Sequence, residues 1–302
     1  MKNILVTGGT VFVSRYVVEY FVRQGHQVFV LNRNNNPQSE GVILLEGDRH
    51  SVGDKLKDYH FDAVLDVTAY TREDVKCLLD ALGDFSQYVF ISSSAVYPET
   101  LPQPFKEEQK CGKNSIWGAY GADKLEAEQY LQEHVPNAYI LRPPYLYGPM
   151  NNVYREGFVF ECADADRPFY LPGDGSMGLQ FFHVEDLCRL IEAVIKEQPQ
   201  EHIINVGNPD TVTIKEWVKL CYQAAGKQPE FREVSSEHAQ RSYFCFHEYD
   251  YVLDVNKQHG LLPGTKPLSV GLKEAYEWYE GNKELVNRRE YMAYIDEKLF
   301  GK

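Results

Sequence analysis

Residues 4–10 read Ile-Leu-Val-Thr-Gly-Gly-Thr, and this stretch decides the fold. Three apolar residues form a short buried strand, and the two glycines make a tight turn before an apolar pattern over residues 12–24 that predicts a helix. Residues 28–31 supply the next strand. A strand, a helix and a second strand in this order require a parallel pair with a right-handed crossover.

The same alternation continues for about half of the chain. Further strands are predicted at residues 41–45, 63–67, 87–92 and 138–142, with helical stretches around residues 74–82 and 120–134 between them. Alternating strands and helices of this kind predict an α/β fold, namely a Rossmann-type doubly wound parallel sheet.

After Gly148-Pro149 the pattern becomes irregular and rich in Pro and Gly. A strand at residues 202–206 and helices at 213–225 and 268–279 follow, and the last twenty residues are expected to form a surface helix. We therefore expect a nucleotide-binding domain at residues 1–150, to which 181–207 return. A smaller substrate-binding region comprises residues 151–180 and 208–302.

Composition limits the function classes. The formal net charge of −13 opposes attraction to nucleic acid or to an anionic membrane. Six scattered cysteines without a Cys-x-x-Cys pair argue against a zinc site or a disulfide framework, so no metal site is predicted. The N-terminus has no export signal and no apolar run is long enough to span a bilayer, which favours a cytoplasmic enzyme.

Tyr120 and Lys124 are the strongest candidates for chemistry. Their i,i+4 spacing places both side chains on one face of a helix, where an ammonium beside a phenol favours the phenolate. Such a phenol can exchange a proton with a substrate hydroxyl or carbonyl while a nicotinamide moves the hydride. An isolated Tyr-x-x-x-Lys is also frequent on amphipathic helices.

The turn at Thr7-Gly8-Gly9-Thr10 offers free backbone N–H groups at a helix N-terminus, which suits a pyrophosphate. In the spacing Gly-x-x-Gly-x-x-Gly counted from Gly8, Val11 and Ser14 replace the second and third glycines. The alternative is a glycine turn that only joins a strand to a helix.

The chain resembles the extended short-chain dehydrogenase/reductases, especially the NAD-dependent epimerase/dehydratase family, over nearly its whole length. The matching segments, in order, are Thr7-Gly8-Gly9, Gly47-Asp48, Ser92-Ser93-Ser94-Ala95-Val96-Tyr97, Tyr120-x-x-x-Lys124, Leu141-Arg142-Pro143-Pro144-Tyr145-Leu146-Tyr147-Gly148-Pro149, Pro172-Gly173-Asp174-Gly175, His183-Val184-Glu185-Asp186 and Asn205-Val206-Gly207-Asn208.

The resemblance implies a catalytic triad of Ser93, Tyr120 and Lys124, with Ser94 as the alternative serine. In that family the serine bonds the substrate oxygen, the tyrosine is the acid/base, and the lysine holds the nicotinamide ribose. The residues that it implies around the cofactor are Thr7, Gly8, Gly9, Thr10, Phe12, Val13, Asn32, Arg33, Asp48, Arg49, Thr68, Ala69, Tyr120, Lys124 and Pro143.

The cofactor is NADP or NAD, and the end of the second strand favours NADP. An acidic residue there would bind the adenosine ribose of NAD, but the strand ends Leu31-Asn32-Arg33-Asn34. Arg33 can hold a 2′-phosphate or stack on adenine, the alternative being a solvated surface arginine. Asp48 resembles the family residue that contacts adenine, although an Asp after a strand can also close a turn.

Positions at which this chain differs from the family's usual residues narrow the class of substrate that we expect. Relatives that act on sugar nucleotides usually have Asn at Tyr145 and Arg at Leu179, two positions in the expected substrate site with Ser94. Loss of that arginine removes a charge-assisted contact to a diphosphate. Dehydratases carry an Asp-Glu pair where Ser94-Ala95 stand, so hydride chemistry without dehydration is expected. His183 is expected to be a structural hydrogen-bonding residue.

Two hypotheses of different class follow. The first is an NAD(P)-dependent oxidoreductase or epimerase acting on a hydroxyl or carbonyl of a small polar, sugar-like molecule. The second is a non-catalytic nucleotide- or RNA-binding protein of the same fold, because the altered turn and phosphate site resemble the atypical branch of the superfamily. Members of the family often dimerise, so a homodimer is one expected assembly.

Overall fold

The structure, a computed structural model, describes residues 1–300 and centres on a parallel sheet. Its seven strands lie in the order β13-β8-β7-β5-β1-β2-β3, and every neighbouring pair is parallel. The strands are β1 (Asn3–Thr7), β2 (Gln27–Asn32), β3 (Val42–Glu46), β5 (Ala63–Asp66), β7 (Tyr88–Ile91), β8 (Tyr139–Arg142) and β13 (Ile203–Asn205). The prediction of a Rossmann-type doubly wound sheet is confirmed.

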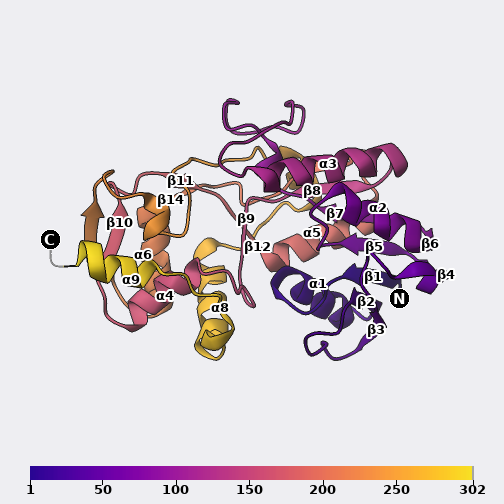
Figure 1. The fold of residues 1–302 in the computed structure, drawn as a ribbon, viewed down its shortest axis with the longest axis horizontal. Coiled ribbons are helices and arrows are strands. Elements are labelled where there is room, and N and C mark those ends of the chain that lie inside the picture. Colours follow the sequence, from indigo (N-terminus) through magenta and orange to yellow (C-terminus); the bar gives the residue numbers. More distant parts are fainter. Residues whose placement is uncertain (301–302) are drawn as a thin grey trace.

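Helices cover both faces of this sheet (Figure 1). They are α1 (Phe12–Arg23) and α5 (Val184–Glu197) on one face and α2 (Arg72–Ala81) and α3 (Ala119–His134) on the other. Each presents an apolar stripe, such as Val17 of α1 and Leu131 of α3, to the buried side chains of the strands. No helix within residues 1–300 has the length and apolar character that crossing a membrane requires.

The order of the strands reverses beside β1, where the chain leaves towards β2 on one side and towards β5 on the other. In sheets of this kind ligands bind outside the carboxyl ends of the strands at such a point. Thr7, Asp66 and Ile91 end β1, β5 and β7 there. The fold therefore places the expected site at this edge.

Most of the elements after residue 150 lie at the end of the molecule away from the sheet, as the labels α4, α6, α8, α9, β10, β11 and β14 show (Figure 1). Paired strands are β4 (Leu56–Phe61) with β6 (Leu82–Phe85), β9 (Tyr145–Tyr147) with β12 (Phe181–His183), β10 (Phe169–Pro172) with β15 (Phe231–Val234) and β11 (Gly178–Leu179) with β14 (Val212–Thr213). Further helices are α4 (Glu156–Asp164), α6 (Ile214–Ala224), α7 (Asn256–Leu261), α8 (Leu268–Glu280) and α9 (Tyr291–Tyr294). Single turns lie at Gly53–Lys55, Ser94–Val96, Gln240–Ser242, Lys283–Leu285 and Ile295–Leu299.

The C-terminal segment differs from the expected surface helix. It begins with α9 and continues into a π-helical turn at Ile295–Leu299. Tyr291, Ile295 and Leu299 are buried in a separate core that includes Phe158 and Tyr279. The charged residues between these positions hide the apolar pattern in the sequence. The apolar face packs the segment against α4 instead of leaving it on the surface.

Candidate active site

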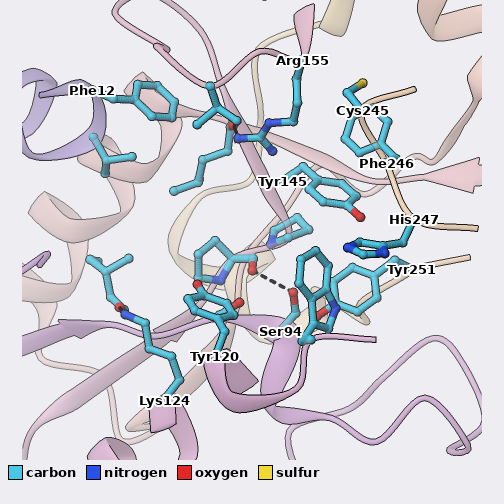
Figure 2. A pocket seen from close by; sticks show the side chains of 18 of the residues that line it. Phe12, Ser94, Tyr120, Lys124, Tyr145, Arg155, Cys245, Phe246, His247 and Tyr251 are labelled. Atoms are coloured by element: carbon cyan, nitrogen blue, oxygen red, sulfur yellow. Dashed lines mark hydrogen bonds between the residues drawn. The ribbon is translucent and has the colours of Figure 1, made fainter. Parts of the chain in front are cut away.

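The cleft that contains the predicted triad lies at the carboxyl edge of the sheet and has a volume of about 410 Å³. Tyr120 and Lys124 line it (Figure 2), and so does Ser93. A second cavity of about 420 Å³ borders the other side of the first turn of α1 and contains Gly8 and Arg33. The two cavities together run from the glycine turn to the C-terminal part of the chain.

The backbone around Tyr120 explains how its phenol reaches this cleft. Gly118, the residue before α3, has a φ of 52°, a left-handed conformation that glycine adopts without strain. A Cβ on Gly121 would lie only 2.4 Å from the carbonyl oxygen of Ala95, so only glycine lets α3 approach the turn at Ser94–Val96 this closely. The first turn of α3 therefore packs directly against residues 92–96, called the serine segment below.

The environment of Tyr120 and Lys124 corrects one expectation. Lys124 is 3% exposed, and its Nζ donates to the carbonyl oxygens of Ala69 at 2.7 Å and Ile91 at 2.8 Å. Burial lowers the pKa of Lys124 to about 8. Burial also raises the pKa of Tyr120, and the Ser93 hydroxyl only partly offsets that rise. Lys124 does not lower the pKa of Tyr120 in this structure, because its ammonium is directed at two carbonyl oxygens.

The two candidate serines differ in what their hydroxyl groups do. Ser94 is buried, and its Oγ donates to the carbonyl oxygen of Pro143 at 2.8 Å. Ser93 is partly exposed, and its Oγ accepts from the backbone N–H of Ala95 at 3.1 Å. An accepting hydroxyl keeps its proton available, so Ser93 is better placed than Ser94 to donate to a bound oxygen.

A buried polar network supports this wall of the cleft from behind. Arg142 on β8 pairs with Glu128 on α3 at 2.5 Å and donates to the Tyr97 hydroxyl at 2.8 Å. Ser92 donates to the same carboxylate, and Tyr97 donates to Asn205 on β13 at 2.8 Å. Because all five groups are buried and paired, they fix α3 and the serine segment relative to the sheet.

The glycine turn has the features that a dinucleotide phosphate requires. Gly9 has a φ of 95°, and α1 begins after Val11 with no side-chain cap and no acidic residue in its first turn. The helix N-terminus thus keeps its N–H groups and positive potential for an anion. Lys124 and Tyr120 lie in the adjoining cleft, which Phe12 and Val13 of the first turn of α1 also line. These residues fit a nicotinamide dinucleotide in an extended position across the two cavities.

The cavity beside the glycine turn contains the residues expected around adenosine. Arg33 is exposed there, while the Nδ2 of Asn32 donates to the carbonyl oxygen of Gly8 at 2.7 Å and ties β2 to the turn. Asp48 accepts from the backbone N–H of His50 at 3.0 Å, so it closes a turn while also lining the cavity.

Arg49 belongs to the same cavity but already has a carboxylate partner. Its guanidinium lies 3.0 Å from Asp66, which is fully buried and also accepts from Thr7 and Tyr88 at 2.7 Å each. Burial alone would raise the pKa of Asp66, but Arg49 and these hydroxyl groups hold that pKa below its ordinary value. Arg49 is therefore neutralised, and Arg33 is left as the arginine free for a cofactor phosphate.

The structure brings most of the predicted site residues to the two cavities. Those that line the triad cleft are Phe12, Val13, Ser93, Ser94, Tyr120, Lys124, Pro143 and Tyr145. Those that line the cavity at the glycine turn are Gly8, Thr10, Asn32, Arg33, Asp48, Arg49 and Thr68. Thr7, Gly9 and Ala69 are buried and line neither cavity. Leu179 is not brought to the cleft: it is fully buried in the C-terminal core.

Several residues of the cleft were not anticipated. Tyr70 and Arg155 approach Tyr120, and Trp117 stacks edge-on against His247 at 5.3 Å. Others are Arg241, Cys245, Phe246, Tyr251 and Arg289. Tyr70 and Trp117 come from loops of the sheet-forming part, and the others come from loops and short turns of the C-terminal part. Neither set lies in a stretch of sequence with a periodic pattern that could signal it.

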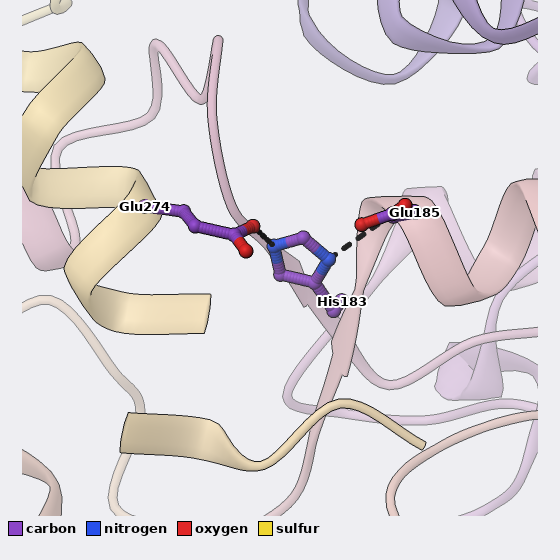
Figure 3. Close-up of side chains that lie close together, drawn as sticks. All are labelled: His183, Glu185 and Glu274. Atoms are coloured by element: carbon purple, nitrogen blue, oxygen red, sulfur yellow. Dashed lines mark hydrogen bonds and ion pairs between the residues drawn. The ribbon is translucent and has the colours of Figure 1, made fainter. Parts of the chain in front are cut away.

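A cluster of His183, Glu185 and Glu274 has ligand atoms within 4.8 Å of one another, the spacing of a metal site (Figure 3). The ammonium of Lys266 already binds both carboxylates, and the Nδ1 of His183 accepts from the backbone N–H of Glu185 at 3.2 Å. Burial lowers the pKa of His183 to about 3, so the imidazole is neutral. The cluster is a structural contact between α5 and α8, as expected for His183.

Comparison with known proteins gives matches over most of the chain. The model of a family described as NAD dependent epimerase/dehydratase matches residues 4–207. The chloroplast stem-loop binding protein of 41 kDa b of Arabidopsis thaliana is 30% identical over 301 residues, covering 91% of this chain and 78% of that protein. A UDP-glucuronate 4-epimerase of Thermodesulfobacterium geofontis is 27% identical over 221 residues, covering 69% of this chain and 64% of that protein.

Among solved structures, the UDP-glucuronic acid 4-epimerase of Bacillus cereus in complex with UDP-glucuronic acid and NAD superposes with a TM-score of 0.72. The match covers 92% of this chain and 99% of that one at 20% sequence identity. At this identity the likeness is one of fold. It agrees with the Rossmann-type fold described above.

Proposed function

The chain belongs to the NAD-dependent epimerase/dehydratase family, and from this premise we propose that it is an NAD(P)-dependent oxidoreductase or epimerase. Its substrate is a small polar, sugar-like molecule with a reactive hydroxyl or carbonyl. The observation that carries the proposal is the convergence of Ser93, Tyr120 and Lys124 in one cleft beside the glycine turn.

The nicotinamide, when bound, supplies or accepts the hydride at the substrate carbon. Ser93 donates a hydrogen bond to the substrate oxygen, and Tyr120 transfers a proton to or from that same oxygen. In the reductive direction the carbonyl carbon gains a hydride, its oxygen gains the Tyr120 proton, and a hydroxyl results. In the oxidative direction the same bonds break and form in reverse.

The raised pKa of Tyr120 favours the reductive direction near neutral pH, because the phenol is then protonated and able to donate. Oxidation needs the phenolate and is expected to speed up as pH rises. Lys124 is positioned by Ala69 and Ile91 so that one further hydrogen bond can go to a ribose hydroxyl. Epimerisation would combine both directions on opposite faces of one carbon.

We also propose that NADP is preferred over NAD. Arg33 is exposed in the cavity beside Asn32, and no ion pair to it exists among residues 1–300. An arginine can bind a 2′-phosphate through two parallel hydrogen bonds, whereas the ribose hydroxyl groups of NAD would need an acceptor in this position.

The first experiment is a calorimetric titration of the protein with NAD, NADH, NADP and NADPH. Binding of at least one pair, followed by nicotinamide-dependent turnover in a panel of sugar-like aldehydes and ketones, is the expected result. Tyr120→Phe is expected to lower kcat on the order of a hundredfold or more while leaving cofactor affinity unchanged. Tyr59→Phe, a partly exposed tyrosine on β4, is the matched control. Absence of binding by all four nucleotides would sink the proposal.

A non-catalytic RNA-binding role is the second candidate, and it is favoured by the similarity to the chloroplast stem-loop binding protein. The net charge of −13 opposes it, since RNA affinity depends on neutralising phosphates. Filter binding of a stem-loop RNA at increasing salt concentration separates the two. Tight binding that weakens steeply with salt, without any turnover, would replace the enzymatic proposal by this one.

A further inference from the structure

Residues 67–69 follow β5 directly and border both cavities of the site. Val67 lines the triad cleft, and Thr68 lines the cavity at the glycine turn. Ala69 is buried, and its carbonyl oxygen accepts a hydrogen bond from the Lys124 ammonium at 2.7 Å. These three residues, called the shared segment below, therefore connect the two ends of the expected cofactor site.

The Thr68 side chain joins two parts of the cavity at the glycine turn. A Cβ on Gly8 would lie only 2.7 Å from the Thr68 methyl carbon, so this methyl group packs against the turn that is expected to hold the pyrophosphate. The Thr68 hydroxyl oxygen accepts a hydrogen bond from Nη2 of Arg49 at 2.8 Å. Arg49 thus reaches the shared segment from the adenosine end of the site.

The guanidinium of Arg49 is held in one orientation. Its two terminal nitrogens donate to the two carboxylate oxygens of Asp66 at 3.0 and 3.3 Å, and this paired arrangement fixes the plane of the group. Nη1 also donates to the carbonyl oxygen of Asp74, in the first turn of α2, at 3.3 Å. The Arg49 side chain is 10% exposed, so it has little freedom to turn towards a ligand.

The same carboxylate fixes the backbone of the shared segment through Thr7. The Thr7 hydroxyl donates to Asp66 at 2.7 Å and accepts from the backbone N–H groups of Val67 at 3.0 Å and Thr68 at 3.2 Å. Thr7 and Asp66 are fully buried. A buried polar network in which the members are paired is rigid, so the shared segment cannot shift unless these contacts break.

The position of the shared segment decides where the Lys124 ammonium lies. An ammonium has three donors, and two of them go to the carbonyl oxygens of Ala69 and Ile91. The direction of the third donor is then fixed, and this donor is the one left for the nicotinamide ribose. Hydrogen bonds weaken steeply as their angle departs from linear, so a displacement of Ala69 would weaken that contact.

We infer that Arg49 is a positioning residue for the nicotinamide end of the cofactor, acting from the adenosine end through the shared segment and Lys124. The inference rests on the proposed function, which assigns a nicotinamide cofactor to the two cavities. Arg49 does not line the triad cleft, so it touches none of the reacting atoms. Its substitution is therefore expected to weaken binding of the nicotinamide riboside and to spare the adenosine part.

The test is a double-mutant cycle on the dissociation constant of NADPH, measured by calorimetry. The proteins are the wild type, Arg49→Lys, Lys124→Met and the double variant. Lysine keeps a positive charge beside Asp66 but lacks the forked donors that also reach Thr68. An effect of Arg49 that is transmitted through Lys124 must disappear when the ammonium is absent.

A second pair of variants leaves the buried ion pair intact. Thr68→Val removes the hydroxyl that accepts from Arg49 but keeps the shape of the side chain beside Gly8, whereas Thr68→Ser keeps the hydroxyl. Arg15→Lys is the control, because it makes the same change at a surface arginine that is paired with Glu19 and lines neither cavity.

Each protein is also titrated with 2′-phospho-ADP, which is NADPH without its nicotinamide riboside. If the wild type binds NADH instead of NADPH, then NADH and ADP form the corresponding pair. A residue that contacts the adenosine part directly changes the affinity for both members of a pair. A residue that positions Lys124 changes the affinity for the whole dinucleotide alone.

We expect Arg49→Lys and Thr68→Val to weaken NADPH binding about fivefold to tenfold when Lys124 is present, and less than about twofold in Lys124→Met. Thr68→Ser, Arg15→Lys and all titrations with 2′-phospho-ADP should stay within about twofold of the wild type.

Equal losses with and without Lys124, or equal losses for NADPH and 2′-phospho-ADP, would overturn the inference, because Arg49 would then act on the cofactor directly or on the fold as a whole. Unchanged NADPH binding by both Arg49→Lys and Thr68→Val would overturn it as well. A wild type that binds no nicotinamide nucleotide would contradict the proposed function itself, and the inference with it, which keeps the two failures distinct.

Discussion

The amino group of Lys124 is buried, and its burial has a measurable effect on the stability of the protein. Its pKa is lowered from 10.5 to about 8 by burial. Below pH 8 the ammonium is charged in both the folded and the unfolded chain, so the cost of burying the charge is fully present. Between about pH 8 and 10.5 the folded chain binds fewer protons than the unfolded one, and stability rises with pH.

We therefore expect the free energy of unfolding of the wild type, relative to Lys124→Met, to increase by roughly 2 kcal/mol between pH 7.5 and 9.5. Methionine has similar length and no titrating group, so the pH dependence of all other residues cancels in the difference. Urea unfolding at the two pH values measures it. A difference that stays constant or falls would show that the Lys124 pKa is not lowered.

Arg33 is expected to decide the choice of cofactor. Arg33→Gln removes the charge available to a 2′-phosphate, so the Kd for NADP should rise about tenfold to a hundredfold while that for NAD changes less than about twofold. Fluorescence titration with both reduced nucleotides measures this. Arg23→Gln is the control, because Arg23 is exposed in the last turn of α1, at the end of the helix away from the glycine turn. Equal losses for both nucleotides would mean that Arg33 stacks on adenine instead.

Single residues differ in how well the sequence could reveal them. Ser93, Tyr120 and Lys124 stand in motifs with fixed spacing, and they lie together because the sheet brings the ends of its strands to one edge. Arg155 and Arg289 stand in no motif, and more than a hundred residues of chain separate them. Only the packing of the C-terminal part makes them neighbours, which no local pattern encodes.

At the scale of elements, the contact of α3 with the turn at Ser94–Val96 sets the geometry of the triad. Gly121→Ala adds a methyl group that would lie 2.4 Å from the Ala95 carbonyl oxygen, so α3 must move away. We expect about 1–3 kcal/mol of destabilisation and a loss of turnover, because Tyr120 moves with the helix. Urea unfolding and steady-state kinetics measure both effects.

Gly260→Ala in α7 provides a matched comparison. It is the same substitution in a helix, but a Cβ at Gly260 would meet no atom within 4 Å. Its expected effect is neutral to stabilising by up to about 1 kcal/mol, from helix propensity alone. If the two variants behaved alike, the close approach at Gly121 would have no energetic significance.

Elements were predictable where they are periodic and long. Strands such as Gln27–Asn32 and helices such as Ala119–His134 lie within two residues of the prediction, because apolar spacing and buried parallel strands leave clear patterns. The pairs β11 with β14 and β9 with β12 have only two or three residues in a strand. Their partners are distant in sequence, and segments this short contain too few positions to show any period.

At the scale of the whole molecule, Lys266 joins the sheet-forming part to the C-terminal part. It binds Glu185 of α5 and Glu274 of α8. These two carboxylates lie on either side of buried His183 (Figure 3). Lys266→Met leaves the two carboxylates facing each other, and we expect a loss of about 1 kcal/mol or more in the free energy of unfolding. Lys298→Met, at an exposed ion pair with Glu297, should cost less, because solvent screens that pair. Urea unfolding measures the free energy of unfolding of both variants. Equal losses would show that Lys266 does not stabilise the contact between the two parts of the chain.

The position of β13 in the sheet has a consequence for synthesis on the ribosome. Six strands of the sheet are complete by residue 142, but the edge beside β8 is covered only when Ile203–Asn205 have been made. Until then Tyr97 lacks its partner Asn205, and the edge of β8 is free to pair with other nascent chains. The sixty residues between β8 and β13 must therefore leave the ribosome before Asn205 can complete the hydrogen-bond network behind the triad cleft. A pause in translation within these residues would lengthen the time during which the exposed edge of β8 can aggregate.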